Sequence, residues 1–322
     1  MKAIRVAEFG GAEKLSLEEI ALPIPAVGQV RIKVTAAGLN FIDVYHRTGL
    51  YAQPLPFTPG LEVAGEITAV GAGVTQFKVG DRVGTAAAIG GYAEEALAPV
   101  GKLVRIPDGV SAETVAALLL QGITAHYLAV DTFPLKAGDT ALIHAAAGGV
   151  GLLLVQIAKM RGARVLATAG GEAKLALARA AGADEAVDYT REDFTAAAKK
   201  FTGGRGVDVV FDSVGASTFE GSVNSLRPRG MMVTFGNASG PVPPFAPRLL
   251  AEKGSLFLTR PTMHAYTQTP EEMQQRADDL FAWVKAGQLS VRIGATFPLA
   301  QAADAHRALE GRRTTGKVLL VP

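Results

Sequence analysis

A cluster of glycines stands between a short apolar stretch and a long aliphatic run in the middle of the chain. The cluster reads HAAAGGVG from His144 to Gly151, and LLLVQIAK follows it. Glycine permits a tight turn and lets a phosphate group approach the N–H groups at the start of a following helix. Measured against G-x-G-x-x-G, the chain supplies Ala146, Gly148 and Gly151, so alanine replaces the first glycine. The segment predicts a strand, turn and helix that bind a pyrophosphate, with close packing of the helix on a sheet as the alternative.

The end of the next strand indicates which dinucleotide would bind. Proteins that bind NAD place an Asp or Glu there, about 20 residues after the glycines, to hold the ribose 2′-hydroxyl. This chain instead reads RVLATAGG and ends the strand at Gly170 and Gly171. No carboxylate there repels a 2′-phosphate, and Lys174 and Tyr189 could bind one. NADPH is therefore the predicted cofactor, although Glu172 leaves NAD open and Lys174 could be an ordinary solvated lysine.

Strands must carry these residues to one edge of a sheet, and the chain has the pattern for it. Between Thr140 and Arg260, six β-branched runs alternate with helical segments, which is typical of a doubly wound parallel sheet. Roughly the first 120 residues contain strands joined by Gly and Asp turns, which predicts a compact β domain. The closing run TTGKVLLVP reads as a strand returning to that domain. We expect an α/β protein with one domain at 1–122 and 264–322 and a dinucleotide-binding domain at 123–263.

Apolar residues at helical spacing also predict an amphipathic helix from Glu271 to Ala286. Met273, Ala277 and Leu280 are the first of these residues, and they recur at intervals of three or four. The interval places them on one face of a helix, so that face should be buried.

Composition removes several classes of function. The 322 residues carry 32 Lys and Arg against 30 Asp and Glu, so no basic surface predicts nucleic acid as a partner. Cysteine is absent, which excludes disulfides, thiolate nucleophiles and cysteine-based metal sites. The five histidines show no ligand spacing, and His144 is interpreted as a buried core residue. The N-terminal stretch has no apolar leader and every long apolar run is interrupted, so we expect a cytoplasmic protein that binds no membrane.

The order of motifs resembles the medium-chain dehydrogenase/reductase superfamily, in which a GroES-like β-barrel precedes a Rossmann domain. Zinc alcohol dehydrogenases of that superfamily have a Cys after the strand of the AAG motif and a His before the Glu of a GHE motif. Here AAGLNFIDVY and PGLEVAG place Asn40 and Leu61 at those positions and retain only Glu62. One carboxylate cannot hold a catalytic zinc, so we expect no metal. Glu62 should instead be a buried partner of an Arg or a backbone amide.

Within the superfamily, the chain resembles the NADPH:quinone oxidoreductase branch, the zeta-crystallin-like proteins. The motifs AAGLNFIDVYHRTGLY, HAAAGGVG, FDSVG, TFGNASG and KGSLFLTRP carry this resemblance, in order, over nearly the whole chain. It implies a zinc-independent reductase that binds NADPH and transfers hydride to a quinone. It also implies a homodimer formed through the last Rossmann strand, residues 255–260, where an unpaired apolar edge would otherwise risk aggregation.

The same resemblance assigns site residues position by position. The residues assigned to the nicotinamide end are Asn40, Asp43, Tyr45 and Tyr51, and those assigned to the phosphates and ribose are Thr124, Gly148, Gly149 and Val150. The residues assigned to the 2′-phosphate are Lys174 and Tyr189, with Gly170 at the strand end beside them. Those assigned to the adenosine and nicotinamide walls are Ser213, Phe235, Asn237 and Ser239. Structural alternatives remain open. Asn40 with Asp43 could be only a helix N-cap, Ser213 could cap the following helix, and Phe235 could be core.

The candidate catalytic residues are Tyr45 and Tyr51, whose hydroxyls could stabilise a developing phenolate, and Asn40, which could orient the nicotinamide amide or the acceptor. Aromatic packing is the alternative for both tyrosines.

A second enzymatic hypothesis is reduction of an activated C=C bond in an enal, enone or enoyl thioester, because related enoyl reductases carry a proton-donating tyrosine at the position of Tyr51. A hypothesis of another class is an NADPH-binding sensor, RNA-binding or structural protein. The sequence leaves open the physiological acceptor and whether single electrons or hydride are transferred.

Overall fold

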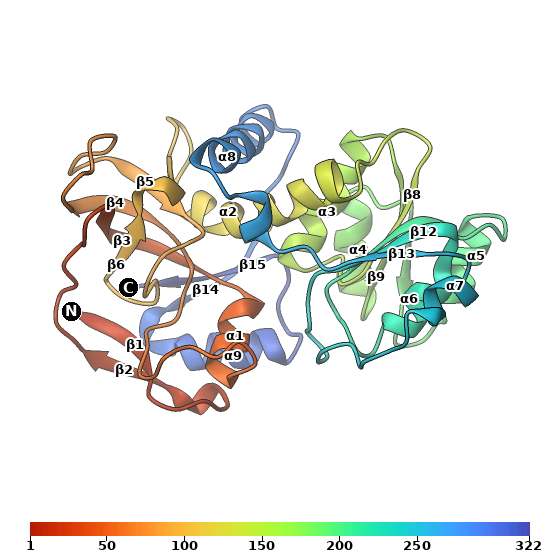
Figure 1. Ribbon diagram of the computed structural model, residues 1–322, viewed down its shortest axis with the longest axis horizontal. Helices are drawn as coiled ribbons and strands as arrows, with labels where there is room; N and C mark the ends of the chain where they lie inside the picture. The colour runs from red at the N-terminus through yellow and green to blue at the C-terminus, as the bar shows by residue number, and fades with distance from the viewer. The chain divides into compact units, whose positions relative to one another are not determined.

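The computed structural model describes residues 1–322 and divides the chain into two compact units. The β unit comprises Met1–Gln121, Thr267–Ala286 and Val291–Pro322, and the α/β unit comprises Gly122–Tyr266 and Gly287–Ser290. The β unit is therefore discontinuous in sequence, because the chain leaves it twice and returns each time. Figure 1 labels most of the helices and strands of both units.

The β unit is built on a mostly antiparallel sheet with the strand order β14-β15-β3-β4-β5-β7, in which β6 also pairs with β3. A separate two-stranded sheet pairs β1 with β2. The strands are β1 (Lys2–Val6), β2 (Leu15–Glu19), β3 (Gln29–Leu39), β4 (Glu62–Val70), β5 (Arg82–Thr85), β6 (Glu95–Pro99), β7 (Leu103–Arg105), β14 (Ile293–Pro298) and β15 (Lys317–Val321). The predicted returning strand is β15, because Leu320 lies opposite Ala37 of β3.

Alternation of apolar and polar residues explains why β3 forms a strand with one buried face. Val30, Ile32 and Val34 are buried in the core of the β unit, whereas Lys33 between them is exposed. A period of two residues places successive side chains on opposite faces of a sheet. Near its end β3 is buried on both faces, which brings the chain to Asn40 inside the unit.

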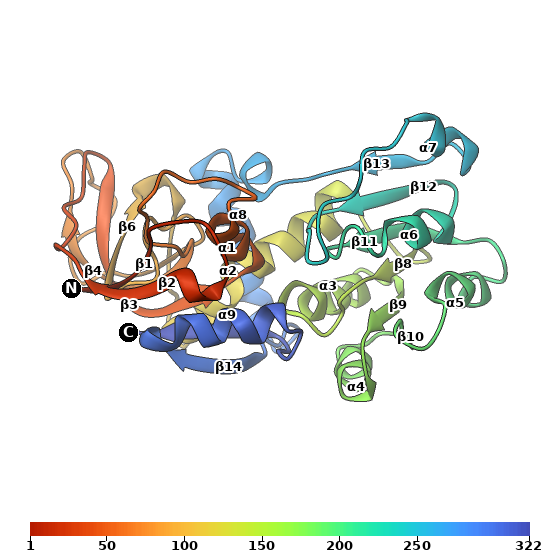
Figure 2. The same cartoon turned by 90° about the horizontal axis from the view of Figure 1, so that it is seen from below.

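Helices close the β unit around this sheet. They are α1 (Phe41–Thr48), α2 (Ala112–Tyr127, which continues into the α/β unit), α8 (Pro270–Lys285) and α9 (Ala302–Glu310). The predicted amphipathic helix is α8, which buries Met273, Ala277 and Leu280. It begins after Thr269, whose side chain accepts a hydrogen bond from the Glu272 N–H group. Figure 2 shows α9 beside β14.

The α/β unit contains a six-stranded parallel sheet with the order β10-β9-β8-β11-β12-β13, so the predicted doubly wound sheet is confirmed. The strands are β8 (Thr140–Ile143), β9 (Arg164–Ala169), β10 (Glu185–Asp188), β11 (Val207–Asp212), β12 (Leu226–Thr234) and β13 (Phe257–Thr259). The strand order reverses at β8, which lies between β9 and β11. Ligands of such sheets bind at the carboxyl ends of the strands beside that reversal.

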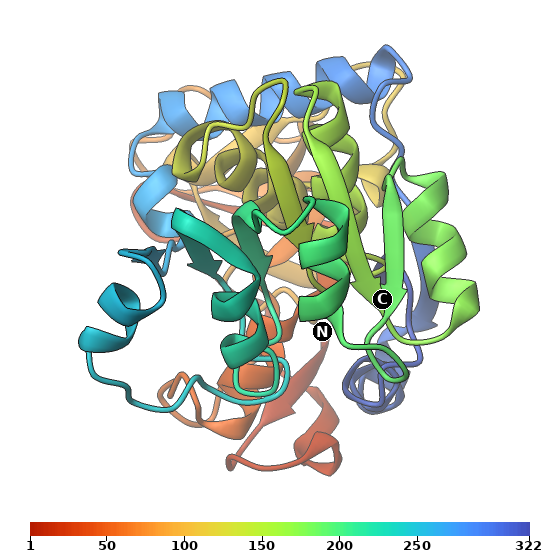
Figure 3. The ribbon, with the colours of Figure 1, turned by 90° about the vertical axis from the view of Figure 1, so that its right-hand side faces the viewer.

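The helices of this unit lie on both faces of the sheet, as Figures 2 and 3 show. They are α3 (Gly149–Met160), α4 (Glu172–Ala180), α5 (Phe194–Phe201), α6 (Phe219–Ser225) and α7 (Arg248–Glu252). Helix α3 packs beside α4, and α5 packs beside α6. The remaining single turns of helix are Ala12–Lys14, Val100–Lys102, Leu128–Thr132, Met263–Tyr266 and Leu299–Gln301.

One helical stretch, Ala112–Thr132, is long and apolar enough to cross a membrane by length and composition. Within its most apolar 18-residue window, 72% is buried inside the protein. Burial of that kind is what a core helix shows, and Leu118, Leu119 and Ile123 on it are fully buried. The stretch is therefore weak evidence for membrane association.

Candidate functional site

The glycine cluster forms a tight turn between β8 and α3, at the reversal point of the parallel sheet. Gly148 is the N-cap of α3 and has extended backbone angles. A Cβ atom at Gly151 would lie 2.4 Å from the Ala145 carbonyl oxygen and 2.7 Å from the Ala146 Cα atom, so only glycine lets the helix pack this closely on the turn. A Cβ atom at Gly148 would meet one atom, at 3.1 Å. Close packing of the helix on the turn therefore explains why position 151 is glycine. At Gly148 the absence of a side chain instead leaves the backbone open to the approach of a ligand group.

The start of α3 offers hydrogen-bond donors for an anion. No side chain caps the helix at Gly148, and no acidic residue lies in the first turn. The first N–H groups of a helix have no partner within it, and the helix dipole adds partial positive charge at this end. The N–H groups of Gly149 and Val150 lie in this first turn and could hold phosphate oxygens, so the turn fits the diphosphate of a dinucleotide.

Side chains around the end of β9 fit a 2′-phosphate better than a free ribose hydroxyl. A Cβ atom at Gly170 would lie 3.4 Å from the Tyr189 hydroxyl oxygen, so the tyrosine lies alongside this glycine. Lys174 lies half-buried in the first turns of α4. Glu172, the alternative ligand for a ribose hydroxyl, forms an exposed ion pair with Arg179 at 2.5 Å.

A carboxylate that the sequence analysis did not identify lies close by. Asp188 ends β10 and accepts hydrogen bonds from the N–H groups of Gly171, at 3.1 Å, and Thr190, at 3.0 Å. Hydrogen bonds from the Thr190 hydroxyl and N–H group hold the pKa of Asp188 below its usual value. Asp188 therefore fixes the turn that follows β9. Its position at a strand end was the only sequence signal for this role.

A buried chain of hydrogen bonds crosses the α/β unit behind the turn. Thr168 Oγ1 lies 2.8 Å from His144 Nδ1, and His144 Nε2 lies 3.0 Å from Ser222 Oγ. Ser222 in turn donates to Asp212 Oδ2 at 2.8 Å. Because its single hydrogen goes to Asp212, Ser222 must accept from His144 Nε2. Burial also lowers the pKa of His144, and the ring is a buried core residue, as the sequence predicts.

Asp212 connects this chain of hydrogen bonds to the loop after β11. Its Oδ1 atom accepts from the N–H groups of Val214, at 2.7 Å, and Gly215, at 3.1 Å. Its Oδ2 atom accepts from the hydroxyl of Thr218 at 2.7 Å. Four donors therefore satisfy one fully buried carboxylate. The sequence analysis missed both Asp212 and Ser222, although FDSVG places an acidic residue at a strand end.

The loops after β11 and β12 bring the remaining predicted residues of this unit together. The Phe235 N–H group donates to the Asp212 carbonyl at 2.8 Å, and the Ser239 hydroxyl donates to the Val214 carbonyl at 2.9 Å. Glycine makes this contact possible, because a Cβ atom at Gly236 would lie 2.3 Å from the Ser213 carbonyl oxygen. The half-buried members of this group are Ser213, Phe235, Asn237 and Ser239. Thr124 lies apart from these loops in sequence, buried on α2.

The residues predicted for the nicotinamide end lie at the start of α1 in the β unit. The Asn40 N–H group donates to Asp43 Oδ2 at 2.9 Å, and the Tyr92 hydroxyl donates to the same oxygen at 2.8 Å. Asp43 is fully buried, and its Oδ1 atom has no partner. Burial raises the pKa of Asp43 to about 6, although both hydrogen bonds oppose the rise. Asp43 therefore stabilises the helix start, whatever else it does.

Asn40 lies in a buried cluster with Glu62 and Lys317. Glu62 accepts a hydrogen bond from the Leu120 N–H group at 2.8 Å, so its predicted backbone partner is confirmed. The predicted alternative, an arginine, is replaced by Lys317, whose Nζ atom lies 2.5 Å from Glu62 Oε2. Burial lowers the pKa of Lys317, and the Glu62 carboxylate opposes that change. Sequence reasoning missed Lys317, because a lysine in the last strand carries no signal of this contact.

Tyr45 and Tyr51 lie against each other. Their ring centroids are 5.2 Å apart at an interplanar angle of 70°, an edge-to-face contact. The Tyr51 N–H group donates to the Tyr45 carbonyl at 3.0 Å. Tyr51 is 40% exposed, whereas Tyr45 is buried. Packing between the two rings explains their mutual arrangement. Of the two side chains, that of Tyr51 is the more accessible to solvent.

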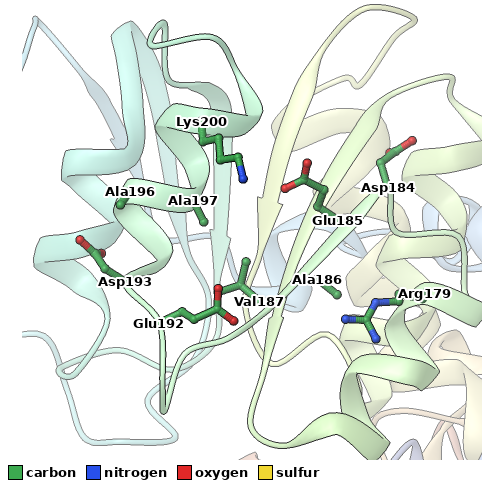
Figure 4. A pocket seen from close by; sticks show the side chains of 10 residues that line it. All are labelled: Arg179, Asp184, Glu185, Ala186, Val187, Glu192, Asp193, Ala196, Ala197 and Lys200. Atoms are coloured by element: carbon green, nitrogen blue, oxygen red, sulfur yellow. The ribbon is translucent and has the colours of Figure 1, made fainter.

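Figure 4 shows a pocket elsewhere in the α/β unit, with a volume of about 580 Å³. It lies along β10, the edge strand of the parallel sheet, and charged side chains such as Arg179, Glu185 and Lys200 line it. None of the predicted site residues belongs to it. Charges of this kind protect a strand edge from pairing with other chains.

The structure contains no group of three or more His, Asp or Glu side chains that could hold a metal ion. Asn40 and Glu62, two of the positions compared with zinc ligands above, contact the ammonium group of Lys317 instead. Lys317 uses lone pairs of these oxygens and its positive charge repels a second cation, so this cluster is not a metal-ligand set.

Comparison with known proteins agrees with this geometry. The family model described as alcohol dehydrogenase GroES-like domain matches residues 26–108, and the model described as zinc-binding dehydrogenase matches residues 149–283. A quinone oxidoreductase of Pseudomonas aeruginosa is 46% identical over 323 residues, which cover 100% of this chain and 99% of that protein. A 2-haloacrylate reductase of Burkholderia is 42% identical, over 97% of this chain and 96% of that protein. The structure of Escherichia coli quinone oxidoreductase complexed with NADPH is 40% identical, covers 100% of both chains and gives a TM-score of 0.97.

Fold and site together define a medium-chain dehydrogenase/reductase, with a GroES-like unit and a Rossmann-like unit. The chain belongs to the quinone oxidoreductase family of that superfamily. The family resemblance and the fold class predicted from the sequence are thereby confirmed. The individual site residues stay predictions, which the contacts described above support to different degrees.

Proposed function

We propose that this protein is an NADPH-dependent quinone oxidoreductase that transfers hydride without zinc. The observation that carries the proposal is the uncapped start of α3 behind a glycine turn, in a chain 46% identical over its whole length to a quinone oxidoreductase. The basic test is oxidation of NADPH by the purified protein with 1,4-benzoquinone or 1,4-naphthoquinone as acceptor. Tight NADPH binding with no turnover of any quinone would instead favour the hypothesis of a sensor or structural protein.

The bound dinucleotide would supply the hydride from its reduced nicotinamide ring. The residues of the α/β unit that would hold it are Gly148, Gly149, Val150, Gly170, Lys174 and Tyr189, with Ser213, Phe235, Asn237 and Ser239 on the loops beside them. Their work is to bind and orient the cofactor, because hydride transfer needs fixed geometry more than it needs protein chemistry.

Lys174→Ala tests the preference for NADPH over NADH. A charged hydrogen bond to the 2′-phosphate is absent with NADH, so the variant should bind NADPH roughly 10-fold or more weakly and bind NADH normally. Fluorescence titration of each cofactor measures both constants. Lys200→Ala, which removes an exposed cation elsewhere in the same unit, is the matched control. Equal weakening of both cofactors by Lys174→Ala would contradict the assignment.

On the acceptor side, the hydroxyls of Tyr45 and Tyr51 are the proposed donors to the developing phenolate oxygen. Tyr51→Phe removes one hydroxyl and leaves the edge-to-face contact with Tyr45 in place. We expect kcat with quinones to fall roughly 10-fold, and NADPH affinity to stay unchanged. A variant with full activity toward quinones would remove Tyr51 from the catalytic group.

Reduction of an activated C=C bond is the second candidate activity, and the 42% identity to a 2-haloacrylate reductase favours it specifically. The two activities are separated by measuring NADPH oxidation with quinones, 2-haloacrylates, 2-alkenals and crotonyl thioesters under the same conditions. Faster turnover of the alkenes, abolished by Tyr51→Phe, would reverse the proposed order. Faster turnover of quinones supports it.

We further propose that the protein is a homodimer that pairs through residues 255–260. Strand β13 is at the edge of the parallel sheet, where it pairs only with β12, and Phe257 on it is 58% exposed. An unpaired apolar edge strand is a ready template for a second copy. Phe257→Lys should therefore shift the mass measured by sedimentation to that of a monomer. Ile24→Lys, at an exposed apolar residue of the β unit, is the control.

A further inference from the structure

The β unit contains a buried ion pair that the proposed cofactor contacts do not explain. The side chains of Lys317 and Glu62 are 1% and 0% exposed, and their charged atoms are 2.5 Å apart. A well-packed apolar pair often stabilises a core as well as a buried ion pair does. A lysine in this place therefore suggests that its ammonium group has a task besides stability.

The contacts of Asn40 indicate what that task is. Asn40 Oδ1 accepts from Lys317 Nζ at 2.8 Å and from Gln121 Nε2 at 3.3 Å. Asn40 Nδ2 donates to the Gly38 carbonyl at 3.0 Å and to Glu62 Oε2 at 2.9 Å. These four contacts use both hydrogens of the amide nitrogen and both lone pairs of the oxygen.

Chemistry also fixes which way the amide of Asn40 points. An ammonium group can only donate a hydrogen bond, and a carbonyl can only accept one. The amide oxygen must therefore face Lys317, and the amide nitrogen must face Gly38. With every position used, the side chain of Asn40 holds its neighbours in place and has no hydrogen bond left for an acceptor molecule.

The backbone around the cluster is shaped for this arrangement. A Cβ atom at Gly38 would lie 2.5 Å from Glu62 Oε2 and 2.6 Å from Lys317 Cε, so any other residue would displace the ion pair. The N–H group of Leu120 donates to the second oxygen of Glu62 at 2.8 Å. Glycine on one side and a helix N–H group on the other hold the carboxylate in one position.

Asn40 is also the N-cap residue of α1. Its N–H group binds Asp43 in the first turn, and the same helix carries Tyr45. The carbonyl of Tyr45 in turn accepts from the N–H group of Tyr51. A shift of Asn40 would therefore move the start of the helix and the pair of tyrosines that follows.

We propose that Lys317 is a positioning residue, whose ammonium group holds Asn40 and Glu62 in a single arrangement and so fixes the start of α1 and the Tyr45–Tyr51 pair. The kinetic part of this inference rests on the proposed reductase activity. A second consequence does not: when the side chain of Lys317 is shortened, the carboxylate and amide oxygens remain, and the space left is a site for a small alkylammonium ion.

The test compares Lys317→Ala with and without ethylammonium chloride. We expect Lys317→Ala to lower kcat with quinones by up to about 100-fold, while the dissociation constant of NADPH changes less than about twofold. Ethylammonium chloride should restore kcat at least about tenfold and raise the melting temperature of this variant. Tetramethylammonium chloride, a cation that donates no hydrogen bond, should do neither at equal ionic strength. Lys317→Met, which fills the space, should respond to neither salt.

A double variant keeps the inference testable if Lys317→Ala does not fold. Glu62→Gln with Lys317→Met removes both charges and preserves both volumes, so no charge is left buried alone. The inference predicts a folded protein with normal NADPH binding and kcat lowered at least about tenfold. Full activity of this double variant, or equal rescue of Lys317→Ala by both salts, would overturn it. A wild-type protein inactive with every quinone would instead contradict the proposed function, and the melting temperatures would still decide the alkylammonium site.

Discussion

The two units bury polar networks of opposite kind. In the α/β unit, the buried carboxylate of Asp212 accepts hydrogen bonds from hydroxyl and backbone donors, and Ser222 links it to His144. In the β unit, by contrast, an ion pair between Lys317 and Glu62 lies in the core.

The networks also differ in completeness. Three buried side-chain atoms of the structure have no hydrogen-bond partner, and all three lie in the β unit: Asp43 Oδ1, Gln121 Oε1 and His306 Nε2. A fully satisfied network makes a rigid support, whereas an unpaired polar atom or a buried charge makes the fold sensitive to changes at that place. We therefore expect substitutions in the network behind the proposed cofactor contacts to disturb the fold less than substitutions in the network behind the proposed acceptor residues.

Removing one member of the charged pair should have the largest effect. Glu62→Ala leaves the ammonium group of Lys317 buried without a carboxylate and removes one hydrogen bond of the Leu120 N–H group. We expect a loss of about 3–5 kcal/mol in the free energy of unfolding. Urea denaturation measures it. A loss below about 1 kcal/mol would mean that the pair is exposed in solution, and the contrast between the units would disappear.

The carboxyl group of Asp43 should make the β unit sensitive to pH. Burial raises its pKa to about 6, so the folded protein binds a proton that the unfolded chain releases between about pH 4 and pH 6. The folded state therefore gains stability as pH falls through this window. Relative to Asp43→Asn, the wild type should gain up to about 3 kcal/mol between pH 7 and pH 4. Parallel curves of unfolding free energy against pH for the two proteins would rule out the raised pKa.

The glycine turn can be tested at two positions that differ in their surroundings. Gly151→Ala forces a Cβ atom against the carbonyl of Ala145, so we expect a loss of about 1–3 kcal/mol in stability together with weaker NADPH binding. Gly148→Ala meets only one atom, at 3.1 Å, so it should weaken NADPH binding with little change in unfolding. Identical unfolding curves for the two variants would contradict the distinction between packing and phosphate approach.

The network of His144, Ser222 and Asp212 should respond least. Ser222→Ala removes the hydroxyl between His144 and Asp212, which costs about 1–2 kcal/mol of stability and should raise the KM for NADPH. Ser225→Ala is the control, because its hydroxyl binds only the Gly221 carbonyl of the same helix, at 2.8 Å. If Ser222→Ala cost more stability than Glu62→Ala, the network around Asp212 would be the more sensitive of the two.

The sequence predicted most of the α/β unit, because its information is local. Each strand and helix has its own periodicity, the glycines lie next to the turn they form, and the absence of a carboxylate after β9 is visible within RVLATAGG. The sequence was less informative about which side chains hold the loops at the strand ends in place. Asp188, Asp212 and Ser222 are ordinary residues until the parallel sheet brings their strand and helix ends to one edge.

The contacts in the cluster around Asn40, by contrast, could be predicted from the sequence only in part. The sequence indicated Asn40 and a buried partner for Glu62, since a polar residue in an apolar segment must find one. It could not indicate that the partner of both is Lys317, which is 277 residues from Asn40 along the chain. The antiparallel pairing of β15 with β3 decides this contact, and pairing between distant strands depends on the whole sheet.

The sequence by itself therefore determined the type and order of the elements, the position of the glycine turn between β8 and α3 and the family to which the chain belongs. Only the tertiary structure decided which polar groups are buried together and in what orientation, including the single amide orientation of Asn40. The physical reason is that periodicity and turn residues act over a few neighbours, whereas a buried hydrogen bond is set by whichever strands the completed core places side by side.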